Sequence, residues 1–170
     1  YVTGNQFFGG GNDSDYYHQY AVGLRDDAVN IWPVILRWMN EHLYYERGFI
    51  TLILTILGIV IIPFMVATLA LPRKKYRIYF DHKNYWIIAL IIALYPSLYY
   101  QTTDMYRDVF MLFLFLIYLA CIKSWCDRKN IFLLLLALLL CYPLYLFRPY
   151  LGAATLLTLL ATPLYSYRHY

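Results

Sequence analysis

Charged residues are scarce in this chain of 170 residues. Only 14% of the residues are Asp, Glu, Lys or Arg, whereas 62% are hydrophobic, and an average soluble domain carries about 25% charged residues. Such a composition cannot cover a folded surface with polar groups, so it predicts a membrane protein with lipid as part of its solvent. We expect no nucleic acid partner, because the few positive charges form no basic patch interleaved with aromatic residues.

Cysteine is also rare, with three residues at Cys121, Cys126 and Cys141. Two of them lie inside apolar runs, and the C-x4-C spacing of the first two has no further metal-ligating company. We expect all three to be reduced packing residues. The sequence also lacks an initial methionine and a charged n-region with a cleavage site, so we expect it to be a fragment or a processed piece of a longer protein.

Long apolar runs without charge make up most of the chain. A run of about 20 apolar residues crosses a hydrocarbon core of about 30 Å at about 1.5 Å per residue. Proline predicts a kink in the first run, at Pro63. The fold class is therefore all-α, a polytopic membrane protein with five transmembrane helices, predicted over about 49–71, 85–100, 108–125, 131–147 and 151–167.

The pattern of apolar residues between Asn30 and Gly48, before the first predicted span, indicates an amphipathic helix. Asn30 is a good N-cap, Pro33 is tolerated in the first turn and Gly48 supplies the stop. Next to a span, such a helix most simply lies in the outer membrane interface. We therefore divide the chain into an outer loop with an interfacial helix, 1–48, and a transmembrane domain, 49–170. The apolar face of the helix comprises Ala28, Ile31, Trp32, Ile35, Met39 and Leu43.

Lysine and arginine gather in the linkers 72–84 and 123–130, which five alternating spans place on the same side of the membrane. Positive residues favour the cytoplasmic side. The predicted localisation is thus the bacterial inner (plasma) membrane, with residues 1–48 on the outer or periplasmic side. The linkers 101–108 and 148–150 then lie on the outer side as well, with most of the ten acidic residues.

Several ionisable residues lie at the outer ends of the predicted spans. Asp104, Arg107 and Asp108 are spaced i, i+3, i+4, which predicts one shared face of a helix that begins near Thr103. Such groups usually face a cavity or one another, but carboxylates also favour helix N-termini, so function and capping both stay open. Arg148 is either a phosphate clamp, because guanidinium binds phosphate bidentately, or an interfacial residue that snorkels to water.

The stretch from Gly9 to Ala21 places two carboxylates, Asp13 and Asp15, behind three glycines. Glycine lets the backbone approach a ligand closely, and Asp13 or Ser14 is expected to cap the helix that follows. One interpretation is a capped helix start with solvated carboxylates. The other is a site for sugar transfer, in which a carboxylate takes a proton from the acceptor hydroxyl and cations stabilise the phosphate leaving group.

The run D-S-D-Y-Y-H-Q-Y-A at residues 13–21 resembles the D-S-x-x-Y-x-x-x-A run in the first outer loop of bacterial multi-pass GT-C glycosyltransferases, the dolichyl-phosphate-mannose mannosyltransferase-like group. The runs 95–97 and 106–108 are similar to the proline, then basic residue plus aspartate, at the outer end of a later span. The resemblance implies a membrane hexosyltransferase that uses a polyprenyl-phosphate-linked sugar donor and a glycan or lipid acceptor at the outer face, in cell-envelope glycan or glycolipid assembly. It implies Asp13 as catalytic base, with Asp15 as the second candidate.

The expected catalytic residues are Asp13, Asp15 and Asp108, and the expected substrate-binding residues are Tyr17, Asp104, Arg107 and Arg148. No cofactor is certain, and Asp13 and Asp108 are the candidates to hold a divalent cation, Mg²⁺ or Mn²⁺. Two alternatives stay open. One is a Wzy-type polysaccharide polymerase, which this sequence also resembles. The other is a lipid or solute transporter or flippase, whose charges would line a path. The ranges 49–71, 109–122 and 131–147, however, hold no charged residue.

Overall fold

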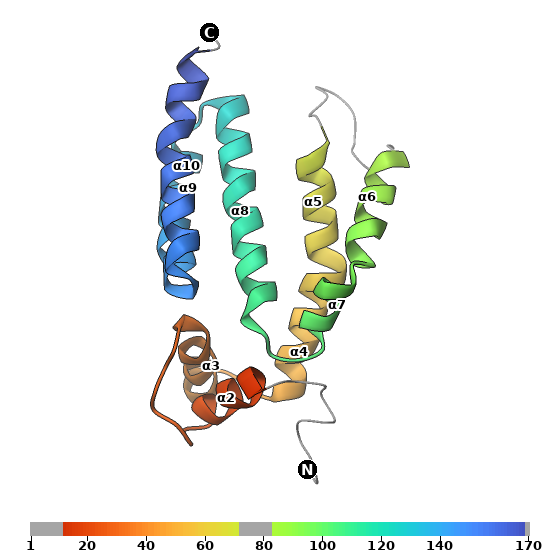
Figure 1. Cartoon of the computed structure of the whole chain (residues 1–170), viewed down its shortest axis with the longest axis vertical. Coiled ribbons are helices and arrows are strands. Elements are labelled where there is room, and N and C mark those ends of the chain that lie inside the picture. Colours follow the sequence, from red (N-terminus) through yellow and green to blue (C-terminus); the bar gives the residue numbers. More distant parts are fainter. Residues whose placement is uncertain (1–11, 72–82, 169–170) are drawn as a thin grey trace. The chain divides into compact units, whose positions relative to one another are not determined.

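The computed structural model describes residues 12–71 and 83–168, and every regular element in these ranges is a helix, which confirms the expected all-α class for them (Figure 1). The chain forms two compact units, Tyr1–Phe110 (unit 1) and Met111–Tyr170 (unit 2). The elements are α2 (Asn12–Ala21), α3 (Ile31–His42), α4 (Arg47–Ile56), the π-helix η1 (Leu57–Ile61), α5 (Ile62–Ala70), α6 (Lys83–Ala93), α7 (Pro96–Thr102), α8 (Arg107–Arg128), α9 (Ile131–Phe147) and α10 (Pro149–Arg168).

Within residues 12–71 and 83–168, two helical segments are long and apolar enough to cross a membrane. They are Arg47–Ala70, with 24 residues, and Arg107–Arg128, with 22 residues, and they correspond to the first and third predicted spans. The apolar helices in the other predicted spans are shorter, at Lys83–Ala93, Ile131–Phe147 and Pro149–Thr162. The five-span topology and the division at residue 48 therefore stay predictions. The basic linker 72–82 and the glycines 9–11 lie outside the described residues.

Proline shapes the first two predicted spans in different ways. Pro63 has no N–H to donate, and the helix widens into the π-helical turn η1 just before it, so that α4, η1 and α5 continue as one rod. Pro96 instead breaks the second predicted span into two helices. Tyr95, directly before it, has an extended backbone (φ −69°, ψ 115°), because the ring of proline disfavours a helical residue ahead of it.

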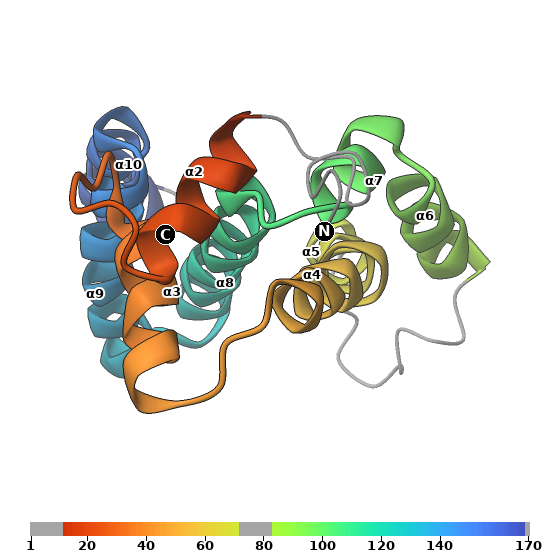
Figure 2. The same ribbon diagram turned by 90° about the horizontal axis from the view of Figure 1, so that it is seen from below.

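In unit 1 the chain leaves along α4, η1 and α5 and returns along α6 and α7 (Figures 1 and 2). The hairpin of α5 and α6 is filled by Ala67, Tyr85 and Ala89. At its other end α7 lies so close to η1 that a Cβ on Gly58 would be 2.3 Å from Thr102 Cγ2. This contact holds the end of α7, which leads into the turn at residues 103–106, beside η1.

The helix α3 agrees with its predicted start but not with its predicted end or surroundings. Asn30 Oδ1 accepts a hydrogen bond from Trp32 N at 2.9 Å, as expected of an N-cap. The expected stop at Gly48 is wrong, because α3 ends at His42 and Gly48 lies inside α4. Trp32, placed on the apolar face, is buried in unit 1, where its Nε1 donates to Met105 O at 2.9 Å. The interfacial position of α3 stays a prediction.

Unit 2 consists of the rest of α8 with the adjacent helices α9 and α10. Its core comprises Tyr118, Cys121, Ala137, Cys141, Leu144 and Leu159. The Tyr118 hydroxyl donates to Thr155 O at 2.7 Å and so ties α8 to α10. All three cysteines are free, as expected; two are buried in this core, whereas Cys126 is exposed.

Candidate functional site

The helix α2 carries the predicted catalytic stretch. It begins at Asn12, so Asp13 and Ser14 lie in its first turn rather than at the N-cap position expected for one of them. Such a shift by one or two residues is common at helix ends. Carboxylates in a first turn still interact favourably with the positive end of the helix dipole.

A pocket of about 610 Å³ opens beside α2. Its walls come from α2, from the exposed loop 22–29 and from the first residue of α8. The lining residues are Asp13, Asp15, Tyr16, Tyr17, Gln19, Arg25, Val29 and Arg107. The structure therefore brings together four residues that the sequence predicts for the site: Asp13, Asp15, Tyr17 and Arg107. Arg25 was not predicted, and it lies over the ring of Tyr16, 5.4 Å from the centroid.

Asp13 and Asp15 differ in what surrounds their carboxylates. Asp13 is exposed and makes no ion pair with any residue that the structure describes. Asp15 is only 16% exposed, and its Oδ1 accepts a hydrogen bond from Arg47 Nη1 at 2.9 Å. Arg47 therefore occupies one oxygen of Asp15, whereas the Asp13 carboxylate faces solvent. The base role of either residue stays a prediction.

Asp104 lies where the sequence did not place it. The helix α8 begins at Arg107, so Asp104 belongs to the turn before it and does not share a helical face with Arg107 and Asp108, as was expected. The turn closes with a hydrogen bond from Tyr106 N to Asp104 O at 2.8 Å. The Asp104 side chain is fully buried, and it does not line the pocket. Its predicted substrate-binding role stays a prediction, and the contacts that the structure shows for Asp104 are with other residues of the protein.

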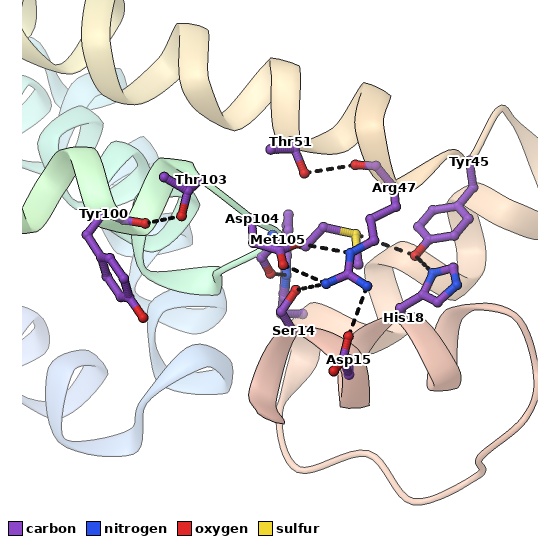
Figure 3. Close-up of polar contacts among 11 residues, drawn as sticks. Ser14, Asp15, His18, Tyr45, Arg47, Thr51, Tyr100, Thr103, Asp104 and Met105 are labelled. Atoms are coloured by element: carbon purple, nitrogen blue, oxygen red, sulfur yellow. Dashed lines mark hydrogen bonds and ion pairs between the residues drawn. The ribbon is translucent and has the colours of Figure 1, made fainter. Parts of the chain in front are cut away.

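Arg47 accounts for the burial of Asp104 (Figure 3). Its guanidinium binds that carboxylate in a fork, with Nε to Oδ1 at 3.1 Å and Nη2 to Oδ2 at 2.5 Å. Nη2 also donates to Ser14 Oγ at 3.1 Å. Together with Asp15, these residues form a buried cluster, here called the Arg47 cluster: Ser14, Asp15, Arg47 and Asp104. One guanidinium thus connects α2, the first turn of α4 and the turn between α7 and α8.

Arg47 was missed in the sequence, although a signal existed. It is the single charged residue of the 24-residue segment Arg47–Ala70, and an ionisable group at the end of an apolar helix normally has a partner. The sequence does not identify that partner, because Asp15 and Asp104 are 32 and 57 residues away along the chain.

Tyr17 connects the pocket to the start of α8. Its side chain is buried, and burial raises the pKa of the Tyr17 hydroxyl above its usual value. The charge of Arg107 opposes this rise, whereas Asp13 and Asp108 add to it. The hydroxyl therefore lies within the field of all three charges, whereas Asp108 itself does not line the pocket.

His18 lies on the side of α2 that faces the Arg47 cluster. Its Nδ1 is hydrogen-bonded to the Tyr45 hydroxyl at 2.9 Å, and the two rings are stacked. Burial lowers the pKa of His18 below its usual value, and the positive charge of Arg47 lowers it further, against the opposing charges of Asp15 and Asp104. Burial and the charge of Arg47 thus both disfavour the protonated imidazole beside this cluster.

Arg148 belongs to unit 2, in the turn between α9 and α10. Its Nη1 donates to the Tyr150 hydroxyl at 2.5 Å, and its guanidinium lies 5.9 Å from the centroid of the same ring. Its role as a phosphate clamp stays a prediction. The residues that the structure describes include no group of three or more His, Cys, Asp or Glu able to hold a metal ion, so a divalent cation at Asp13 and Asp108 would need ligands from substrate or water.

We expect Arg47→Met to destabilise the protein strongly. The substitution keeps an apolar stem but leaves the Asp104 charge buried without its partner, and breaking a buried ion pair costs about 3–5 kcal/mol. The measurement is the midpoint of unfolding in detergent micelles. The control is Arg37→Met, because the partners of Arg37, Asp26 and Glu41, are 87% and 53% exposed and such pairs contribute little. Equal midpoints for the two variants would contradict a central role for Arg47.

We expect His18→Gln to reduce the loss of stability in acid. The folded state holds the pKa of His18 below its usual value of 6.5, so on acidification the unfolded chain takes up this proton first. The free energy of unfolding therefore falls as the pH drops below about 6.5, until the lowered pKa is passed. The measurement is the unfolding midpoint between about pH 8 and pH 5, with the exposed His42→Gln as control. Parallel curves for the wild type and His18→Gln would refute this coupling.

Comparison with protein-family models, with curated proteins and with solved structures finds no match to this chain. The likeness to GT-C glycosyltransferases is therefore carried by its short motifs alone. Support for a function has to come from the pocket and from the charges around it.

Proposed function

We propose that the protein is an integral membrane glycosyltransferase that transfers sugar from a polyprenyl-phosphate-linked donor to a glycan or lipid acceptor at the outer face of the bacterial inner membrane, in cell-envelope glycan or glycolipid assembly. One observation carries the proposal: an exposed carboxylate without an ion-pair partner among the described residues, Asp13, and a half-buried cation, Arg107, line the same pocket. Transfer from a sugar phosphate needs a proton acceptor and a cation of this kind.

Asp13 is the proposed general base. In this role its carboxylate takes the proton from the acceptor hydroxyl as that oxygen attacks the anomeric carbon of the sugar. The bond from that carbon to the phosphate oxygen breaks, and the polyprenyl phosphate leaves. Asp15 is less suited to this role, because Arg47 occupies its Oδ1. Asp108 is left to orient the acceptor or to hold a divalent cation.

Arg107 is the proposed phosphate contact. It is the first residue of a 22-residue helix, and backbone N–H groups at a helix N-terminus favour an anion beside them. Its guanidinium can bind two phosphate oxygens at once. The rings of Tyr16 and Tyr17 in the same pocket provide apolar faces for a sugar.

The start of each long apolar helix supports a site at the membrane surface. Among the described residues, the segments long and apolar enough to cross a membrane are Arg47–Ala70 and Arg107–Arg128. The first begins in the Arg47 cluster, and the second begins at the pocket. A lipid-linked donor presents its phosphate at this level, because its tail stays in the hydrocarbon.

The test is sugar transfer by the Asp13→Asn variant. Asparagine keeps the shape of aspartate and its compatibility with a helix start but cannot take the proton, and loss of a general base costs about 10²–10⁴ in rate. The measurement is transfer from radiolabelled polyprenyl-phosphate sugars by membranes that contain the full-length protein, at matched abundance.

The matched control is Asp27→Asn. Asp27 is also an exposed carboxylate of unit 1, but it does not line the pocket, so its variant should keep full activity. Near-normal transfer by Asp13→Asn would exclude Asp13 as the base. Absence of transfer by the wild type with every polyprenyl-phosphate donor would count against the proposed function itself.

A further inference from the structure

The C-terminal half of α3 and the connection from α3 to α4 expose large apolar and aromatic side chains. In a soluble protein, such side chains are normally buried. Trp38, Leu43 and Tyr44 are 51%, 65% and 59% exposed. We call these three residues the aromatic edge. Tyr44 touches Phe49 edge-on, with ring centroids 5.4 Å apart, and Phe49 is the first residue of a longer apolar surface.

That surface is a stripe along the outside of α4 and η1. Its exposed members recur every one to four residues along the helix, so they cover one side of it: Phe49, Leu52, Ile53, Ile56, Val60 and Ile61. The opposite side, with Ile50, Leu54 and Leu57, is buried in unit 1. The stripe is therefore a second apolar face, in excess of the face that forms the core. Exposed patches of this kind mark contact with protein or membrane.

The length of the helix indicates which of the two covers the stripe. The segment Arg47–Ala70 has 24 residues and is long and apolar enough to cross a membrane, and the stripe follows it from its first turn. The hydrocarbon core of a bilayer matches the length of this helix and would surround all exposed side chains of the stripe with apolar chains.

We propose that the aromatic edge lies in the membrane–water interface and fixes the depth of the protein in the bilayer. This inference rests on the membrane location in the proposed function. Trp and Tyr collect at this level because they combine an apolar ring with a polar group. In this protein each of the two rings contacts a polar neighbour. The Tyr44 hydroxyl donates to Glu46 Oε2 at 2.7 Å, and the ring of Trp38 stacks on that of His42.

The edge differs from the lipid-facing surface expected for this helix. Trp32, expected there, is 4% exposed and donates its Nε1 proton to Met105 O, so it holds α3 on the protein. In this proposal the residues in contact with lipid are instead those at the C-terminal end of α3 and those just before α4.

The depth has a consequence for the pocket. Arg47 follows Tyr44 by three residues, so an interfacial Tyr44 places the Arg47 cluster at the level of the lipid headgroups. The pocket shares Asp15 with that cluster and then opens at the same level. A phosphate attached to a membrane-embedded tail would reach it without leaving the bilayer surface.

The experiment uses quenching of tryptophan fluorescence by brominated lipids. The full-length protein is reconstituted into phosphatidylcholine vesicles whose acyl chains carry bromine either near the headgroup or near the chain end. Single-tryptophan proteins, with the other tryptophans replaced by Phe, retain either Trp38 or Trp32. A third protein has Ile56→Trp as its single tryptophan and reports on the stripe.

We expect Trp38 to lose most of its emission with the shallow bromines and little with the deep ones. Trp32 should keep its emission in both, and Ile56→Trp should be quenched most by the deep bromines. Because replacing Trp32 removes a buried hydrogen bond, Trp38→Phe alone in the otherwise unchanged protein provides a second measurement: it should remove a large part of the emission that shallow bromines quench.

Two results would overturn the inference, and they have different meanings. Quenching of Ile56→Trp without quenching of Trp38 would show that the helix crosses the membrane and that the aromatic edge is covered by something other than lipid. The proposed function would then stand. Absence of quenching at both positions would remove the membrane location, and the proposed function with it.

Discussion

The ion pairs of the Arg47 guanidinium are the interactions on which the rest of unit 1 depends. The guanidinium binds the fully buried Asp104 in a fork and reaches Asp15 and Ser14 on α2 with its remaining donors. Charges buried in this way are expensive unless each has its partner, so the α7–α8 turn, the start of α4 and the first turn of α2 have one favourable arrangement. The cluster also fixes the positions of the pocket walls, because α2 contributes Ser14 and Asp15 to it and α8 begins three residues after Asp104.

The cluster also separates the acidic residues into those that pair with Arg47 and those that do not. Asp15 and Asp104 are held by one arginine, which makes them structural partners, although Asp15 also touches the pocket. Asp13 and Asp108 remain beside Tyr17 and Arg107, and their charges act on the Tyr17 hydroxyl. This pocket lies at the start of one helix of membrane length and shares Asp15 with the Arg47 cluster at the start of the other. Its composition and this position are the physical basis for proposing sugar transfer from a lipid-linked phosphate.

Some local signals in the sequence predicted the structure correctly, although the helix stop expected at Gly48 did not, because that glycine lies inside α4. The N-cap at Asn30 and the limits of the helix at 131–147 follow from neighbouring residues, and the structure agrees with both. The position of Asp104 could not be predicted, because its spacing from Arg107 suits a helix that contains both residues. The helix α8 in fact begins at Arg107, three residues after Asp104. The pairing of Arg47 with Asp104 joins residues 57 positions apart, and hydrophobic periodicity carries no information about such a contact.

A double-mutant cycle on Arg47 and Asp104 tests the role of the cluster most directly. Asp104→Asn removes the charge but keeps a side-chain oxygen. This oxygen can still accept the hydrogen bond that Met105 N donates to Asp104 Oδ1 in the wild type, at 2.8 Å. Each single variant, Arg47→Met and Asp104→Asn, should be unstable, and the double variant should recover much of the loss, with a coupling free energy of about 2–3 kcal/mol. Additive losses of unfolding free energy in the double variant would contradict a fold that depends on this ion pair.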